Sequence, residues 1–145
     1  MIFGAAKILA VILSLGLITC TLAHAVCPVN VVIVKGRVEH APSNARVRVQ
    51  LVYPKKQGGD SGEATVENGR FSVPIEFLTQ SRRPLLVGSL REKCDRRPET
   101  AVVTLVGSDL SREYDRVSLD LKTDFKLADP TAYTLRSEIV LNGPQ

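Results

Sequence analysis

Apolar and polar residues alternate strictly between residues 45 and 53 of the chain. The apolar positions are Val47, Val49, Leu51 and Tyr53, and the polar positions between them are Arg46, Arg48 and Gln50. A period of two predicts a β-strand with one buried face and one solvent face, and β-branched valines suit a pleated surface. In a helix, successive residues are about 100° apart, so Arg46 and Arg48 would fall beside the valines. We therefore predict a strand whose apolar residues face the core.

A hairpin over residues 63–75 is the most sharply defined local structure in the sequence. Asn68-Gly69 is a strong hairpin signal because a type I′ turn needs a positive φ at both of its central residues. A turn there pairs Val66 with Phe71 and Ala64 with Val73 on the inner face, and Thr65 with Ser72 and Glu67 with Arg70 on the outer face. Pro74 falls on the outer face and has no N–H to donate. We therefore expect this strand to lie at a sheet edge or to end there.

The rest of the chain predicts further short strands joined by turns. Strands are expected at residues 31–38, 85–90, 101–106, 117–121 and 133–141, with Ser137 as the one inward polar residue of the last strand. Turns or loops are expected at 40–44, 55–62 and 91–98, and one turn of helix at 108–114 with Asp109 as its cap. Many short strands with no long helix are typical of a β-sandwich. We predict a single all-β domain, an antiparallel sandwich of seven to eight strands.

The first 25 residues have the three parts of a secretory signal peptide. Lys7 is the one charged residue, residues 8–22 are almost purely apolar, and Ala23-His24-Ala25 is a small-x-small cleavage site. The apolar run is shorter than the roughly 20 residues of a membrane span, which disfavours an uncleaved anchor. Lipidation of Cys20 is disfavoured because Thr19 stands where a lipoprotein motif wants a smaller residue. Cleavage predicts a secreted chain of residues 26–145 with no transmembrane anchor.

Cys27 and Cys94 are the cysteines that remain after this cleavage. Two cysteines in an oxidising compartment have one intramolecular partner available, which predicts a Cys27–Cys94 disulfide that holds the 91–98 loop. The alternative is a buried free thiol together with an intermolecular bridge. His40 is the only further soft ligand in residues 26–145, so a closed four-ligand zinc site is not expected. We predict no metal and no cofactor.

Three segments resemble the opening half of transthyretin-like and carboxypeptidase-regulatory-like modules. Residues 34–38 supply a Gly-x-Val strand, residues 45–51 an alternating V-x-V-x-L strand, and residues 64–73 a T-x-x-x-G-x-F hairpin. Cys94-Asp95-Arg96-Arg97 followed by a valine-rich strand is similar to secreted transthyretin-like proteins. Immunoglobulin-like and collagen-adhesin B-type sandwiches share patterns of this kind. The resemblance implies a prealbumin-like sandwich over residues 26–145 and implies no activity by itself.

The enzymes of this fold group need residues that the chain does not supply. Hydroxyisourate hydrolases use several histidines, and intradiol dioxygenases bind iron through two Tyr and two His, whereas residues 26–145 hold His40 alone. A Ser-His-Asp triad would have to use His40, and no Gly-x-Ser-x-Gly elbow is present. A hydrolase with a pair of carboxylates stays open, although no Asp or Glu stands in an apolar context that would raise its pKa. We expect a protein without enzymatic activity.

A cluster of basic residues is the one candidate binding feature, and it flanks the predicted disulfide. Its members are Arg82, Arg83, Arg91, Lys93, Arg96 and Arg97. One interpretation is recognition of an acidic partner, either an extracellular protein or an acidic surface. The other is a solvated face partly neutralised by Glu92, Asp95 and Glu99. The net charge of +4, which loss of Lys7 lowers by one, and the absence of Trp argue against a nucleic-acid partner.

Two functions from different classes follow from these observations. The first is a small secreted binding module, such as an effector or extracellular ligand, that recognises an acidic partner. The second is a structural or small-ligand carrier protein of the cell surface or wall. A carrier requires a cavity, so the tertiary structure bears directly on the choice between them.

Overall fold

The computed structural model of the protein describes residues 27–56, 59–84 and 90–145. The predicted signal peptide lies outside this range, as do residues 85–89 of one predicted strand. The elements in chain order are β1 (Val29–Glu39), β2 (Arg46–Val52), the 3₁₀ turn η1 (Pro54–Lys56), β3 (Ser61–Thr65), β4 (Arg70–Leu78), β5 (Ser81–Pro84), β6 (Leu90–Lys93), β7 (Thr100–Val106), β8 (Glu113–Asp120), β9 (Phe125–Asp129), β10 (Ala132–Leu135) and β11 (Ile139–Asn142).

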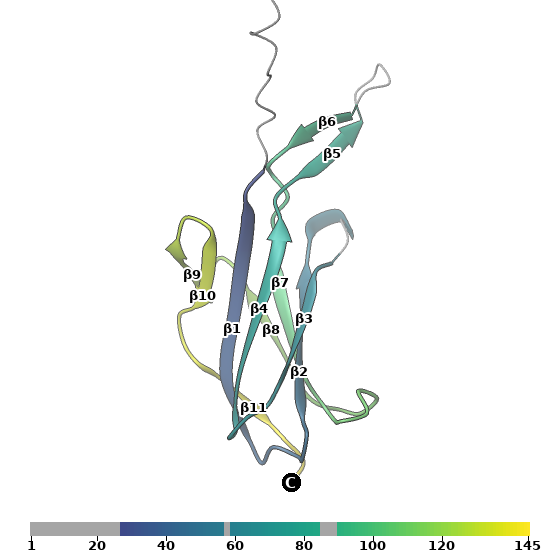
Figure 1. Cartoon of the computed structure of the whole chain (residues 1–145), viewed down its shortest axis with the longest axis vertical. Helices are drawn as coiled ribbons and strands as arrows, with labels where there is room; N and C mark the ends of the chain where they lie inside the picture. The colour runs from purple at the N-terminus through teal and green to yellow at the C-terminus, as the bar shows by residue number, and fades with distance from the viewer. Residues whose placement is uncertain (1–26, 57–58, 85–89) are drawn as a thin grey trace, which may run out of the picture.

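The strands form two sheets packed face to face, so the prediction of an all-β sandwich is confirmed. One sheet has the order β3-β2-β7-β8, and the other contains β4, β1, β10, β9 and β11. β5 and β6 form a separate two-stranded ribbon that projects beyond one end of the sandwich (Figure 1). The described residues thus contain nine strands in the two sheets, and the predicted number of seven to eight is too low.

The inward faces predicted from alternation are confirmed in β2 and β4. Val47, Val49 and Leu51 have no exposed surface, and Tyr53 is also buried. The same alternation runs along β4, where every second side chain from Phe71 to Phe77 is buried. Burial of these side chains against the facing sheet is the main stabilising contribution, at about 1.5–3 kcal/mol for each large aliphatic or aromatic residue.

The turn of the predicted hairpin is confirmed, but the pairing beyond it is wrong. Asn68 and Gly69 have φ values of 51° and 70°, and Glu67 pairs with Arg70. Beyond that bridge the two arms separate, because β3 pairs with β2 and β4 pairs with β1 in the opposite sheet. β1 is the only hydrogen-bonded partner of β4 among the described strands, so the prediction that Pro74 lies in an edge strand is confirmed.

The sandwich is mixed rather than antiparallel, because the C-terminal strands run parallel to β1. β10 pairs with Val31–Ile33 and β11 pairs with Gly36–Glu39. The predicted single strand 133–141 is therefore divided, and Ser137 is exposed in the interruption instead of facing inward. At this interruption the N–H of Arg136 donates to the Asp124 carbonyl at 2.8 Å, and its Nε donates to the Phe125 carbonyl at 3.0 Å.

Two other local predictions also need correction. Residues 91–93 belong to strand β6 rather than to a loop. Residues 108–114 form no helix, since Leu110 has a φ of 60° and lies outside the right-handed helical region. The Asp109 carboxylate instead accepts hydrogen bonds from the hydroxyl of Ser111 at 2.6 Å and from its N–H at 3.3 Å, and these bonds hold the pKa of Asp109 below its ordinary value.

Candidate functional site

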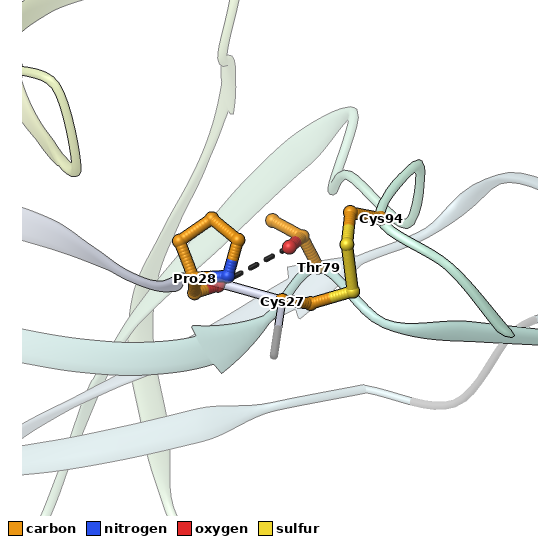
Figure 2. The surroundings of a disulfide bond; sticks show 4 residues. All are labelled: Cys27, Pro28, Thr79 and Cys94. Atoms are coloured by element: carbon orange, nitrogen blue, oxygen red, sulfur yellow. Dashed lines mark hydrogen bonds between the residues drawn. A yellow bond between two sulfur atoms is a disulfide. The ribbon is translucent and has the colours of Figure 1, made fainter. Parts of the chain in front are cut away.

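The predicted disulfide and one hydrogen bond join three chain segments at the end of the sandwich that carries the ribbon. Cys27 precedes β1 and Cys94 follows β6, and their Cα atoms are 5.3 Å apart. Thr79 follows β4, and its buried hydroxyl donates to the Pro28 carbonyl at 3.1 Å (Figure 2). The covalent bond and this hydrogen bond therefore fix the base of the ribbon to the first strand of the sandwich.

Arg96, a member of the predicted basic cluster, makes several contacts within the protein. Its Nη1 atom lies 3.1 Å from Asp60 Oδ2 and 3.1 Å from the Leu78 carbonyl oxygen. Its guanidinium carbon lies 3.7 Å from the centroid of the Tyr53 ring, which is a cation–π contact. The Arg96 side chain is only 16% exposed, so little of its charge is available to a partner.

Asp60 completes this arrangement, although the sequence indicated only an exposed loop there. The Tyr53 hydroxyl donates a hydrogen bond to the Asp60 carboxylate, which also pairs with Arg96. Burial raises the pKa of Tyr53 well above its ordinary value, and the hydrogen bond and negative charge of Asp60 act in the same direction. Tyr53 therefore remains a neutral hydrogen-bond donor through the physiological pH range.

The ribbon carries four of the six predicted basic residues. In its antiparallel register Ser81 pairs with Lys93, Arg82 with Glu92, and Arg83 with Arg91. Cys94 follows this pairing immediately, and its disulfide offsets part of the entropic cost of ordering the two strands.

Arg97, the sixth residue of the predicted cluster, contributes to a different feature. Its Nη1 donates to the Tyr133 hydroxyl at 3.0 Å, and its side chain lines a pocket that the sequence did not predict. This pocket, which we call the cationic pocket, has a volume of about 410 Å³. Its lining residues are Phe77, Arg97, Pro98, Leu121, Lys122, Phe125, Lys126, Leu127, Tyr133 and Arg136.

The cationic pocket is assembled from four separate parts of the chain. Phe77 comes from the end of β4, and Arg97 and Pro98 come from the segment after the disulfide. The five lining residues between positions 121 and 127 come from the β8–β9 turn and β9, and Tyr133 and Arg136 come from β10 and the residue after it. The ring centroids of Phe77 and Tyr133, which both line it, are 6.2 Å apart. In the sequence its basic residues are dispersed among acidic ones, so no local charge run indicated this site.

No cluster of three or more potential metal ligands occurs in the described part of the chain. Within the same residues, no helix has the length and apolar character needed to cross a membrane. Comparison of the chain with protein-family models, with curated proteins and with solved structures finds no match.

Proposed function

We propose that this chain is a secreted, non-enzymatic binding module that recognises an acidic extracellular protein through the β5–β6 ribbon. The observation that carries the proposal is the register of the ribbon, which sets Arg83 opposite Arg91 and adds Arg82 and Lys93 on the same two strands. Four basic residues are thereby gathered on an element that projects beyond the sandwich (Figure 1). Carboxylates of an acidic partner would form charge-assisted hydrogen bonds with such cations, and their opposite charge would speed association.

The extracellular location is supported by the disulfide and by the signal-peptide pattern. Disulfides persist in oxidising compartments and are rare in reducing ones. The Cys27–Cys94 bond lies at the base of the ribbon, so oxidation also orders the segment that we assign to binding. The two-sheet architecture agrees with the prealbumin-like type implied by the resemblance to transthyretin-like modules, and that finer assignment is part of this proposal.

A binding function rather than catalysis is supported by the position of His40. A Ser-His-Asp triad would require this residue, and it lies exposed in the β1–β2 turn with a φ of 54°. β1 runs from the disulfide end to this turn, so His40 is at the end of the sandwich opposite the ribbon. Among the residues that the structure describes, the ribbon therefore has no histidine near it to act as a general base.

The proposal is tested by reversing charges on the ribbon. The triple variant Arg82→Glu, Arg83→Glu and Arg91→Glu is compared with wild type for binding to immobilised poly-L-glutamate at low and at physiological salt. Wild type is expected to bind, more weakly at the higher salt because exposed charges are screened over about 8–10 Å. The ribbon variant is expected to lose binding at both salt concentrations.

A matched control separates the ribbon from net charge. The triple variant Arg37→Glu, Arg70→Glu and Arg112→Glu changes the charge by the same amount at exposed positions outside the ribbon. We expect it to retain binding and both triple variants to keep the melting temperature of wild type within a few degrees. Equal loss of binding in the two triple variants, or equal retention, would refute the assignment to the ribbon. Stronger binding to heparin than to poly-L-glutamate would indicate that the partner is an acidic glycan and not an acidic protein.

A further inference from the structure

The cationic pocket combines an apolar floor with a rim of positive charges. Phe77 and Phe125 are almost completely buried beneath it, and Leu121 is buried beside them. Leu127 is 56% exposed at its edge. The apolar residues therefore continue from the core of the sandwich to the surface in this pocket.

The charged residues of the pocket are all of one sign. Four of the ten lining residues are basic, namely Arg97, Lys122, Lys126 and Arg136, and none is acidic. In the described residues none of these four side chains forms an ion pair with a carboxylate. An apolar depression lined by four cations that have no carboxylate partner among the described residues is suited to an anion.

Two of the four cations are held in place by hydrogen bonds to the pocket wall. Arg97 donates to the Tyr133 hydroxyl at 3.0 Å, and Arg136 donates through Nε to the Phe125 carbonyl at 3.0 Å. Each bond uses one N–H of a guanidinium group, which has five, so N–H groups remain for a ligand. Lys122 and Lys126 make no side-chain hydrogen bond with the described residues and are free to adjust to a bound anion.

We propose that the cationic pocket binds a small amphipathic carboxylate, a molecule with one anionic group on an apolar body. The volume of about 410 Å³ lies within the range of small-molecule sites and is too small for a folded partner. The apolar floor stabilises a ligand by removing its hydrocarbon surface from water, and the rim supplies charge-assisted hydrogen bonds to the carboxylate. A polyanion without an apolar part leaves the floor exposed to water, and a neutral lipid leaves the four cations unpaired.

This binding site is independent of the proposed function of the ribbon. The ribbon residues are absent from the pocket lining, and the pocket residues other than Arg97 lie outside the predicted basic cluster. The Arg82→Glu, Arg83→Glu and Arg91→Glu variant is therefore expected to bind a carboxylate ligand as wild type does. Loss of poly-L-glutamate binding with retention of ligand binding distinguishes the two sites.

The chemical class is tested by titrating the oxidised protein with ligands that share a chain and differ in head group. Isothermal titration calorimetry is performed with decanoate, decanol and decyltrimethylammonium, and with acetate as the head group alone. We expect decanoate to bind at least about tenfold more tightly than decyltrimethylammonium, since a hydrogen bond to a charged group contributes about 1.5–3 kcal/mol. Acetate is expected to show no saturable binding. Equal affinity for the cationic and anionic ligands, or no binding of decanoate, would overturn the proposal.

The location is tested with two matched pairs of variants. The Lys122→Gln and Lys126→Gln double variant removes two rim charges, and Arg37→Gln with Arg70→Gln removes two exposed charges elsewhere. Leu127→Ser removes the exposed apolar edge of the pocket, and Val52→Ser removes an apolar side chain that is 40% exposed on another strand. We expect the two pocket variants to weaken decanoate binding by about tenfold and the two controls to leave it unchanged. Wild-type affinity in both pocket variants would place the ligand elsewhere.

Discussion

The ring of Phe71 occupies the space that a side chain at Gly36 would need. The two residues are cross-strand neighbours on β4 and β1, and a Cβ atom built on Gly36 would lie 2.7 Å from Phe71 Cζ. The same Cβ would lie 2.6 Å from the carbonyl oxygen of Ile139 in β11, which pairs with the other edge of β1. Gly36 therefore allows an aromatic side chain to cover β1 at the place where β11 joins it.

The Gly36–Phe71 contact predicts two unequal losses of stability. Gly36→Ala is expected to lower the free energy of unfolding by about 1–3 kcal/mol, because the backbone of β11 has to move. Phe71→Ala is expected to cost roughly 3–5 kcal/mol by leaving a cavity in the core. Arg46→Thr, on the solvent face of β2, is the control and should change stability by no more than about 0.5 kcal/mol. Urea denaturation measures the free energy of unfolding of all three variants. A larger loss for Arg46→Thr than for Phe71→Ala would contradict the assignment of Phe71 to the core and of Arg46 to the solvent face.

Arg96 and Arg97 are predicted to differ although they are neighbours of the same type. Arg96→Gln removes the cation that lies between Asp60, Tyr53 and the Leu78 carbonyl, and should cost about 1–3 kcal/mol. Arg97→Gln removes one hydrogen bond at an exposed position, and should cost at most about 0.5 kcal/mol. The free energies of unfolding of the two single variants provide the comparison. Equal costs would contradict the separate roles described above.

Tyr53 is expected to make the protein sensitive to alkaline pH. Its pKa in the folded state lies above the value of about 10 in the unfolded chain, so above that pH the unfolded chain loses this proton first. The unfolded state then binds fewer protons than the folded state, and the free energy of unfolding falls as pH rises. Tyr53→Phe should reduce this fall, as measured by urea denaturation at pH about 9 and about 11. All other groups titrate equally in wild type and in Tyr53→Phe. If the free energy of unfolding falls by the same amount with pH in both, Tyr53 has no such effect.

The processed form of the protein is predicted to begin at Val26 and to contain the Cys27–Cys94 disulfide. The intact mass of the secreted chain, measured with and without reduction, checks both features. A cross-link between residues that are 67 positions apart should contribute roughly 4 kcal/mol to stability through the entropy of the unfolded chain. Cys27→Ala with Cys94→Ala should therefore denature at a clearly lower urea concentration. A free-thiol signal in the secreted protein would rule out the bond.

The Asn68-Gly69 turn is expected to tolerate glycine and to reject a β-branched residue. Gly69 has a φ of 70°, so Gly69→Val should destabilise the protein by more than about 1 kcal/mol. Asn68→Gly is the matched control, because glycine adopts the φ of 51° at that position without strain. Its effect should stay within about 1 kcal/mol. Thermal or urea denaturation measures the stability of the two variants. A larger loss of stability for Asn68→Gly than for Gly69→Val would refute the assigned turn.

Short-range features of the sequence determined much of the fold. The facing of Val47, Val49 and Leu51 followed from alternation, because burial of one face imposes a period of two along a strand. The turn at Asn68 and Gly69 followed from the backbone conformations that these two residues tolerate. The disulfide followed from the presence of two cysteines after the predicted cleavage site. Each of these inferences needs only neighbouring residues or a count, so the sequence contains it directly.

Tertiary structure decided which elements meet. Alternation assigns a face to a strand but not a partner, so β3 and β4 joined opposite sheets, and β10 and β11 paired in parallel with β1. The different environments of Arg96 and Arg97 depend on Asp60 and Tyr133, each 36 residues away in the sequence. The cationic pocket likewise exists only where distant segments converge. These outcomes depend on competition among long-range contacts, in which the burial of a whole sheet outweighs the preference of any single segment.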